Sequence, residues 1–316
     1  MRVVRIASIV AFACSSPAVV EPVVLATPSA TVLGLGAGDD RVDWTTLSGA
    51  LESVAKTGGA ATSVHVTPLV AGSATTVLFD QSLVYTAEFY SGLLRIDPAA
   101  ETATVLDGSV YAAALDHDGY VYWASAGASP GIKRVMGSSP IETLAAGVQA
   151  QAIAVDSVGV YWVEGLFPPP ICIFCKPCDG AQGPVKMRAT STGAITTVAT
   201  ATPGDWTLAA DGDALYVTDS CAGTVTRVSH AGEATTLASG LEGVGSIALD
   251  ARKAFVIANG RLARVDKVTG AVDFLATGGA IPSALAVDDS SVYFVGRAHG
   301  DAGSSDRIFA LAKPSW

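Results

Sequence analysis

The residues best placed to do chemistry in this chain are its cysteines. Five are present, and three of them follow one another at two-residue gaps as Cys172-x-x-Cys175-x-x-Cys178, with Cys221 43 positions further on. Three thiolates at that spacing, with a remote fourth, are typical of an iron–sulfur cluster or a four-cysteine zinc site. The same four thiols can instead form two disulfides, and a Cys-x-x-Cys pair alone suggests thiol exchange. The compartment in which the protein works decides between these chemistries.

The N-terminal segment, residues 1–17, predicts export. Arg2 and Arg5 precede an apolar run of eight residues at positions 6–13, which is too short to span a bilayer. The run ends in Ala11-Phe12-Ala13-Cys14, and a basic start, a short apolar stretch and small residues at a cleavage point form the pattern of a secretory signal. This ending resembles a bacterial lipoprotein signal, in which Cys14 becomes the lipidated first residue, and it fits an ordinary signal-peptidase cut as well.

Export favours disulfides for the remaining cysteines, because exported proteins meet an oxidising environment. Parity agrees, since removing a lipidated Cys14 from the five cysteines leaves four. We therefore predict two disulfides among Cys172, Cys175, Cys178 and Cys221, in one of three connectivities between which the sequence does not choose. A metal held by these thiols and free, redox-active thiols are the alternatives. The cofactor prediction is none, with a divalent metal as the alternative.

Other candidate catalytic groups are scattered along the sequence. Of the four histidines, only His299 suggests a metal or acid–base site, because Asp301 and Asp306 lie close to it. Nucleophile-elbow, phosphate-loop and His-Glu zinc motifs are absent from the sequence. The formal charge is −10, from 19 Lys and Arg against 29 Asp and Glu. This balance argues against nucleic acid or an anionic membrane surface as the main partner, since both require a basic footprint.

A repeat organises the rest of the chain. Its unit reads Ala-Val-Asp, a short gap, Val-Tyr-Trp, a loop, Gly-x-x-Arg and a Thr-rich segment that ends Leu-Ala-Gly. At intervals of 40, 36, 40, 55, 39 and 38 residues, the Asp of this unit recurs as Asp40, Asp80, Asp116, Asp156, Asp211, Asp250 and Asp288. The long interval holds the cysteine-rich insertion, 164–184. Runs of Tyr, Trp, Val and Thr separated by Gly, Asp, Ser and Pro predict strands, four to a repeat.

Four short strands in each repeat predict an all-β fold, a β-propeller of seven four-stranded blades, in one domain over 18–316. The last repeat lacks its fourth strand, whereas the segment 18–26 has no repeat of its own. We expect this N-terminal strand to complete the last blade and close the ring, which leaves no open edge. Six blades are the alternative. An arginine recurs at one position of the third strand, as Arg95, Arg134, Arg227 and Arg264, and we interpret it as blade architecture.

The second strands end in a recurring four-residue pattern. Its copies are Tyr161-Trp162-Val163-Glu164, Tyr216-Val217-Thr218-Asp219, Tyr85-Thr86-Ala87-Glu88 and Tyr122-Trp123-Ala124-Ser125. The pattern resembles the Tyr-Trp-Thr-Asp repeat of YWTD-type propellers, found in ectodomains like those of low-density-lipoprotein receptors. It is also similar to repeats of exported bacterial proteins in the NHL and TolB-like group. YWTD propellers usually have six blades, and one copy here keeps the terminal Thr-Asp. The resemblance implies the fold and no particular function.

The expected function is a binding or scaffold module for a protein, peptide or glycan. We expect an exported monomer, either anchored in the bacterial cell envelope or secreted, with no nucleic-acid partner and no membrane contact except through the lipid anchor. Binding would use the face that carries the loops between second and third strands. The alternative is a metal-dependent hydrolase or lyase resembling the lactonases of this architecture. Its central channel would be lined by Glu88, Glu164, Asp219 and Asn259.

Overall fold

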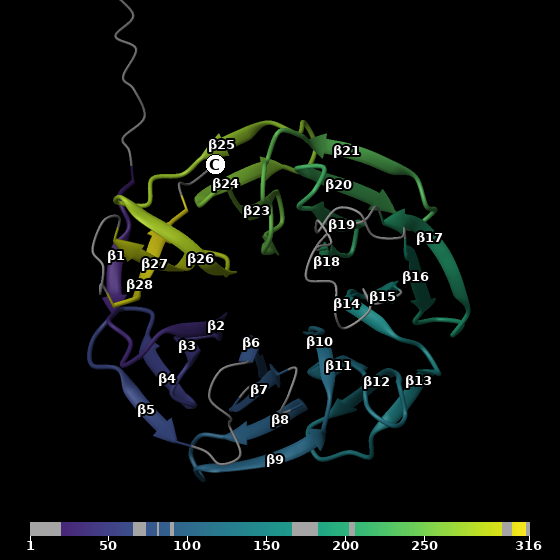
Figure 1. Ribbon diagram of the computed structural model, residues 1–316, viewed down its shortest axis with the longest axis horizontal. Helices are drawn as coiled ribbons and strands as arrows, with labels where there is room; N and C mark the ends of the chain where they lie inside the picture. The colour runs from purple at the N-terminus through teal and green to yellow at the C-terminus, as the bar shows by residue number, and fades with distance from the viewer. Residues whose placement is uncertain are drawn as a thin grey trace, which may run out of the picture.

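Each repeat forms one antiparallel sheet of four strands, and seven such sheets stand around a central axis as the blades of a β-propeller (Figure 1). This computed structural model describes residues 20–65, 74–80, 82–88, 92–165, 183–201, 206–298 and 305–313. Within these ranges every regular element is a strand. The prediction of seven blades is confirmed, and the six-blade alternative is wrong.

The strands of each blade follow one another from the axis outward, and we number them first to fourth. Blades 1 to 4 consist of β2 (Val32–Ala37), β3 (Arg41–Thr46), β4 (Ala50–Ala55), β5 (Thr62–His65); β6 (Ala74–Asp80), β7 (Leu83–Glu88), β8 (Gly92–Asp97), β9 (Thr102–Asp107); β10 (Val110–Leu115), β11 (Tyr120–Ser125), β12 (Gly131–Met136), β13 (Glu142–Ala146); and β14 (Ala150–Val155), β15 (Gly159–Glu164), β16 (Gly183–Ala189), β17 (Ile195–Ala201). Blades 5 to 7 consist of β18 (Trp206–Asp211), β19 (Ala214–Asp219), β20 (Thr224–Ser229), β21 (Ala234–Ala238); β22 (Ile247–Leu249), β23 (Lys253–Ala258), β24 (Arg261–Asp266), β25 (Val272–Phe274); and β26 (Ala280–Val287), β27 (Ser291–Ala298), β28 (Arg307–Ala312), β1 (Val23–Ala26).

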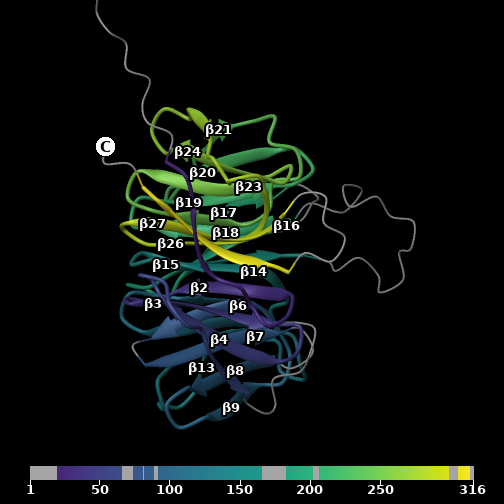
Figure 2. The same ribbon diagram turned by 90° about the vertical axis from the view of Figure 1, so that its left-hand side faces the viewer.

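The N-terminal strand closes the ring, as predicted. β1 pairs antiparallel with β28, so the fourth strand of blade 7 comes from the start of the chain. Its buried end, Leu25 and Ala26, packs in one cluster with Trp44 of blade 1 and Tyr293 of blade 7. Figure 2 shows the side of the ring where strands of the first blade (purple) lie beside those of the seventh (yellow). The closure therefore depends on both a backbone ladder and an apolar contact.

The core lies between neighbouring blades. The second strand of a blade has a strand on each side and a neighbouring sheet against each face, so its residues are almost all buried; in β19 every residue is. The side chains of Trp44, Trp123 and Trp162 are fully buried on three second strands. One apolar cluster joins Tyr161 of blade 4 to Leu215 of blade 5. The aromatic positions of the repeat are thus explained by packing, since burying one such side chain contributes about 1.5–3 kcal/mol.

Two predicted segments lie largely outside the described residues. The export segment, 1–17, falls before the first described residue, and of the insertion 164–184 only Glu164, Gly165, Gly183 and Pro184 are described. In the described part of the chain, no helix has the length and apolar character of a membrane span. The division into a signal and one propeller domain with an insertion stays a prediction at its N-terminal boundary.

Candidate functional site at the blade junctions

The repeating aspartates stand at the end of the first strands, and they hold the turn that leads into the second. In blade 7, Oδ1 of Asp288 accepts hydrogen bonds from the backbone N–H groups of Ser290 and Ser291, both at 2.8 Å. The aspartates of blades 3 to 6 accept backbone N–H groups in the same way. This is the usual side-chain-to-backbone turn of aspartate. One carboxylate oxygen of each turn is therefore occupied by its own backbone.

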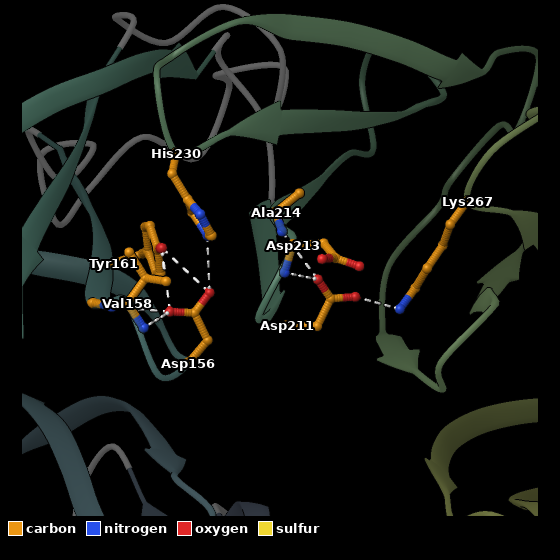
Figure 3. A network of polar contacts seen from close by, with 9 residues as sticks. Asp156, Val158, Tyr161, Asp211, Asp213, Ala214, His230 and Lys267 are labelled. Carbon is orange, nitrogen blue, oxygen red and sulfur yellow. Dashed lines mark hydrogen bonds and ion pairs between the residues drawn. The ribbon is translucent and has the colours of Figure 1, made fainter.

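The second oxygen of four of these aspartates contacts a cationic or imidazole side chain of the next blade. Lys267 Nζ lies 2.5 Å from Asp211 Oδ2, and His230 Nε2 lies 3.2 Å from Asp156 Oδ2 (Figure 3). The other two pairs are Lys56 with Asp288 at 2.5 Å and Lys313 with Asp250 at 2.7 Å. Each partner directly follows the third strand of its own blade. These contacts connect blades 7 and 1, 4 and 5, 5 and 6, and 6 and 7.

The same four side chains also lie against an aromatic ring of the second strand. Lys56, Lys267 and Lys313 place Nζ 5.7, 5.0 and 5.1 Å from the ring centroids of Tyr293, Tyr216 and Phe255. His230 stacks on Tyr161 with ring centroids 6.2 Å apart. An ammonium over an aromatic face is attracted by the ring quadrupole. We call this arrangement the acid–aromatic–cation cluster: Asp288–Tyr293–Lys56, Asp156–Tyr161–His230, Asp211–Tyr216–Lys267 and Asp250–Phe255–Lys313.

The charges within the clusters stabilise the ionised carboxylates. Burial works to raise the pKa of Asp211, but the hydrogen bonds from Lys267 and the turn amides outweigh it, so the pKa lies below the ordinary value. The same balance lowers the pKa of Asp250 and of Asp288, with Lys313 and Lys56 as the respective donors. Burial, with Asp288 beside it, raises the pKa of the Tyr293 phenol to about 12. The three lysine clusters are thus ion pairs that connect neighbouring blades.

Blade 1 departs from this pattern at a buried acid. Asp43 occupies the position at which blades 2 to 5 and 7 carry a tyrosine and blade 6 a phenylalanine, and its side chain is 2 % exposed. It accepts a hydrogen bond from Arg41 Nε at 3.0 Å. Burial raises the pKa of Asp43 to about 6, against the lowering effect of Arg41. Asp43 lines a pocket of about 340 Å³ together with Arg41, Leu51, Ser53, Thr62, Val64, Pro98 and Ala99.

A second pocket, of about 370 Å³, lies where the first strands of blades 3 to 5 end. It is lined by Leu115, Asp116, His117, Val155, Asp156, Ser157, Ala210, Asp211 and Gly212. Its three carboxylates are all engaged: Asp116 also accepts the Tyr122 hydroxyl at 2.8 Å, and Asp156 and Asp211 belong to clusters. Each of these carboxylates therefore already accepts hydrogen bonds from its own turn and from a further side chain.

The four residues predicted to line the channel end second strands in different blades. Asp219 is buried and accepts the backbone N–H groups of Cys221 and Ala222, both at 2.9 Å. Glu164 accepts the indole N–H of Trp162 at 3.1 Å. Asn259 is exposed in a turn with φ 49°. Glu88 ends β7, and its side chain lies outside the described part of the structure. In their sheets each second strand is separated from the axis by a first strand.

The predicted cysteine site falls largely outside the described residues. Cys14, Cys172, Cys175 and Cys178 are not among them. Cys221 is half-buried in the loop after β19, and it is disulfide-bonded in the structure. The presence of two disulfides and their connectivity stay predictions. Among the described residues, no group of three or more His, Cys, Asp or Glu is placed to hold a metal.

The histidine and aspartates near the C-terminus have separate outcomes. His299 and Asp301 lie outside the described residues. Asp306 is buried, and it accepts the backbone N–H of Val32 and the Arg297 guanidinium, both at 2.8 Å, which ties blade 7 to blade 1. The cluster cations were missed from the sequence. Each of them lies three residues after the recurring third-strand arginine or its equivalent, a position whose residue type varies from blade to blade.

Comparisons with known proteins support the fold. No family model and no curated protein matches the sequence. Among solved structures, a catalytically inactive virginiamycin B lyase from Staphylococcus aureus, with quinupristin, has a TM-score of 0.67 at 14 % identity, covering 93 % of this chain and 98 % of the lyase. The WD40 β-propeller domain of Doa1 has a TM-score of 0.65 at 15 % identity, covering 92 % and 97 %. A chain of the nidogen/laminin complex has 0.51 at 14 %, covering 73 % and 91 %. Together with the seven sheets, these likenesses establish a seven-bladed β-propeller.

Proposed function

We propose that this propeller is an exported binding module for a protein, peptide or glycan. The observation that carries this proposal is the engagement of its acidic groups: Asp156, Asp211, Asp250 and Asp288 each bind their own turn and the next blade. A general base or metal ligand needs oxygen atoms that can turn toward a substrate. These carboxylates instead fasten blades together, so that the loops at the two ends of the ring remain as the surfaces for recognition.

The face with the loops between second and third strands is the proposed recognition surface. It carries the cysteine-rich insertion of blade 4 and, in the next blade, the loop with Cys221. A pocket of about 290 Å³ between blades 4 and 5 contains Asp219 and Ala222 of this same loop, with Val185, Thr200 and Thr224 among its other lining residues. Disulfides in these loops would reduce the entropy lost when a ligand is bound.

The metal-dependent hydrolase or lyase is the second candidate, because one similar structure is a lyase. The bonds of Asp219 to two backbone N–H groups and of Glu164 to Trp162 do not favour it.

The test is a panel of glycans and peptides titrated calorimetrically against the full chain, beside a panel of lactones assayed with Ca²⁺, Mg²⁺ and Mn²⁺. Saturable binding with unchanged ligand supports the module. Turnover that requires metal and is lost in Asp219→Asn would replace it by the enzyme.

Export and anchoring through Cys14 are part of the proposal. Labelled palmitate should enter the wild-type chain expressed in a bacterium and should be absent from the Cys14→Ala variant. Label retained by the variant would exclude Cys14 as the lipid site. Labelled protein recovered without cleavage after position 13 would contradict the lipoprotein signal.

A further inference from the structure

The junction between blades 2 and 3 has the acid and the aromatic ring of a cluster without its cation. Asp80 stands at the aspartate position of blade 2, and Tyr85 stands on β7 at the ring position. The cation position of blade 3, directly after β12, is Gly137. At the four complete clusters this position is Lys56, His230, Lys267 or Lys313.

The register shows that these positions are equivalent. Tyr85 pairs with Arg95 across β7 and β8, as Tyr216 pairs with Arg227 across β19 and β20. On the next blade, Gly137 lies three residues after Arg134, as Lys267 lies three residues after Arg264. The strand registers of the two junctions therefore match. They differ in the side chain that the following blade supplies and in the turn that carries it, because Gly137 has φ 51° and none of the four cluster cations has a positive φ.

Two polar groups of this junction lack the partners that their equivalents have. The Tyr85 side chain is fully buried, and its hydroxyl has no hydrogen-bond partner among the described residues. In blades 3, 4 and 7 the tyrosine hydroxyl bonds its aspartate. The half-buried Asp80 carboxylate accepts no hydrogen bond from any described residue. A buried hydroxyl without a partner costs about 1–3 kcal/mol, so the junction is incomplete as it stands.

The charge of Arg95 acts on Tyr85, but no described lysine or arginine donates a hydrogen bond to the Asp80 carboxylate. Arg95, the closest recurring arginine, directs Nη1 to the carbonyl oxygen of Gly137 and toward the hydroxyl of Ser138. Asp116 of blade 3 adds a second negative charge, and burial together with this charge raises the pKa of Asp80. A Cβ atom placed on Gly137 would meet nothing within 4 Å, so the space beside that position is open.

We propose that the junction of blades 2 and 3 binds the ammonium group of a lysine side chain presented by a protein or peptide partner. The assignment of the partner rests on the proposed binding function. The ammonium chemistry rests on the molecule itself, since three complete clusters show a lysine ammonium against the same acid and ring. Asp80 would accept one ammonium proton in a hydrogen bond. The Tyr85 ring is fully buried, so a cation–π contact with the ammonium requires the side chains that cover the ring to shift.

The test uses the full chain labelled with ¹⁵N-glycine, because two glycines report on the junction. Gly119 lies against the Asp80 carboxylate: a Cβ atom placed on Gly119 would be 2.9 Å from Oδ1 of Asp80. Gly137 stands at the cation position. Nα-acetyl-lysine methylamide is titrated at constant ionic strength, with its Nε-acetylated form as the uncharged control. We expect both glycine signals to shift with a Kd of the order of 1 mM, and the Nε-acetylated form to leave them unchanged. Equal shifts with both compounds, or none, would overturn the proposal.

Variants separate the site from general folding. Asp80→Asn should weaken binding at least about tenfold while leaving the fold intact, because Asp80 accepts no hydrogen bond from the described residues. The matched control is Asp250→Asn, at the same repeat position, where Lys313 already occupies the junction. This variant should bind the lysine compound at the junction of blades 2 and 3 as tightly as the wild type does. Gly137→Lys should abolish binding by placing the chain's own lysine at the site, but Gly137 has φ 51°, so this substitution also strains the turn and the decisive variant is Asp80→Asn. Unaltered binding in Asp80→Asn would refute the assignment, even if glycans or peptides bind elsewhere on the propeller.

The source of the ammonium is settled by a comparison of ligands. A tripeptide with a central lysine should bind more tightly than n-butylamine, because the rim of the junction can contact a peptide backbone. Equal affinities for the tripeptide and for n-butylamine would show that the site recognises only the amine, and this result would overturn the assignment of a peptide partner. Shifts of the same glycines with Ca²⁺ or Na⁺ alone, and none with the lysine compound, would replace the ammonium by a metal cation.

Discussion

Nζ of Lys56 lies 2.5 Å from Oδ2 of Asp288, so a side chain of blade 1 binds a turn of blade 7. The pair spans 232 residues of sequence at the place where the ring closes. β1 closes the same junction from outside by pairing with β28. The ends of the repeat array are thus held by a backbone ladder at the periphery and by an ion pair closer to the axis.

The ion pair at the closure should contribute measurably to stability. Both side chains are about one-fifth exposed, so the pair is partly screened by solvent. Replacing Lys56→Met removes the charge and leaves Asp288 with its turn amides and Tyr293. We expect the free energy of unfolding to fall by about 1–2 kcal/mol, measured by urea denaturation followed by tryptophan fluorescence.

Lys186→Met is the matched control for that variant. Lys186 lies on the third strand of blade 4, and its Nζ donates to the Thr197 hydroxyl at the surface. Its substitution should change the free energy of unfolding by less than about 0.5 kcal/mol. Equal losses in the two variants would show that Lys56 has no special part in closing the ring.

The same ion pair predicts a dependence on pH. Burial works to raise the pKa of Asp288, but the hydrogen bond from Lys56 and the turn amides outweigh it, so this pKa lies below its ordinary value. A lowered folded-state pKa stabilises the fold above the unfolded-state value, and this stabilisation is lost as the pH falls through the folded-state pKa. The stability difference between wild type and Lys56→Met should therefore be full at pH 7 and shrink below about pH 4. A difference that stays constant down to about pH 2 would contradict the assignment.

Asp43 predicts a pH dependence of the opposite sign. Burial raises its pKa to about 6, so its neutral form is favoured in the folded protein. The stabilisation linked to this proton is full below the unfolded-state pKa of about 3.9 and is lost as the pH rises to about 6. Compared with wild type, Asp43→Asn should become relatively more stable by about 2 kcal/mol between pH 4 and pH 7. Urea titrations at both values check this, and a difference independent of pH would show that Asp43 is ionised throughout.

The repeat made most of the fold predictable from the sequence, but it concealed the junctions. Asp116 and Tyr122 recur in type, so their strands and turns follow from the pattern. The cation position does not recur in type: it is lysine, histidine, proline, glycine or threonine according to the blade. The role of this position depends on which side chains face each other across neighbouring blades. A contact between blades cannot be recognised from the sequence of one repeat. Asp219 shows the opposite case. The sequence predicted that its carboxylate lines the channel, but this carboxylate accepts hydrogen bonds from the backbone N–H groups of Cys221 and Ala222 in the loop that follows it.

The contribution of the N-terminal strand can be measured at one buried residue. Leu25 is 8 % exposed in the cluster between blades 7 and 1, whereas the neighbouring Val24 is 44 % exposed. Leu25→Ala should lower the free energy of unfolding by about 2–3 kcal/mol through lost burial and the cavity left behind. Val24→Ala on the same strand should cost less than about 0.5 kcal/mol. Similar values for both would mean that β1 adds little to the closure beyond its backbone ladder.

The cysteine loops provide the last prediction. Cys221 follows Asp219, whose carboxylate fixes the loop through the backbone N–H groups of Cys221 and Ala222. A disulfide from this ordered loop to the insertion of blade 4 would restrict the insertion and lower the entropy of the unfolded chain, an effect of about 2–4 kcal/mol. Peptide maps of the exported protein, run with and without reductant, should differ by two disulfides, and Cys221→Ser should leave one of the insertion cysteines open to alkylation and lower the melting temperature. Four alkylatable thiols in the exported wild-type protein would exclude the disulfides and return the cysteines to the metal alternative.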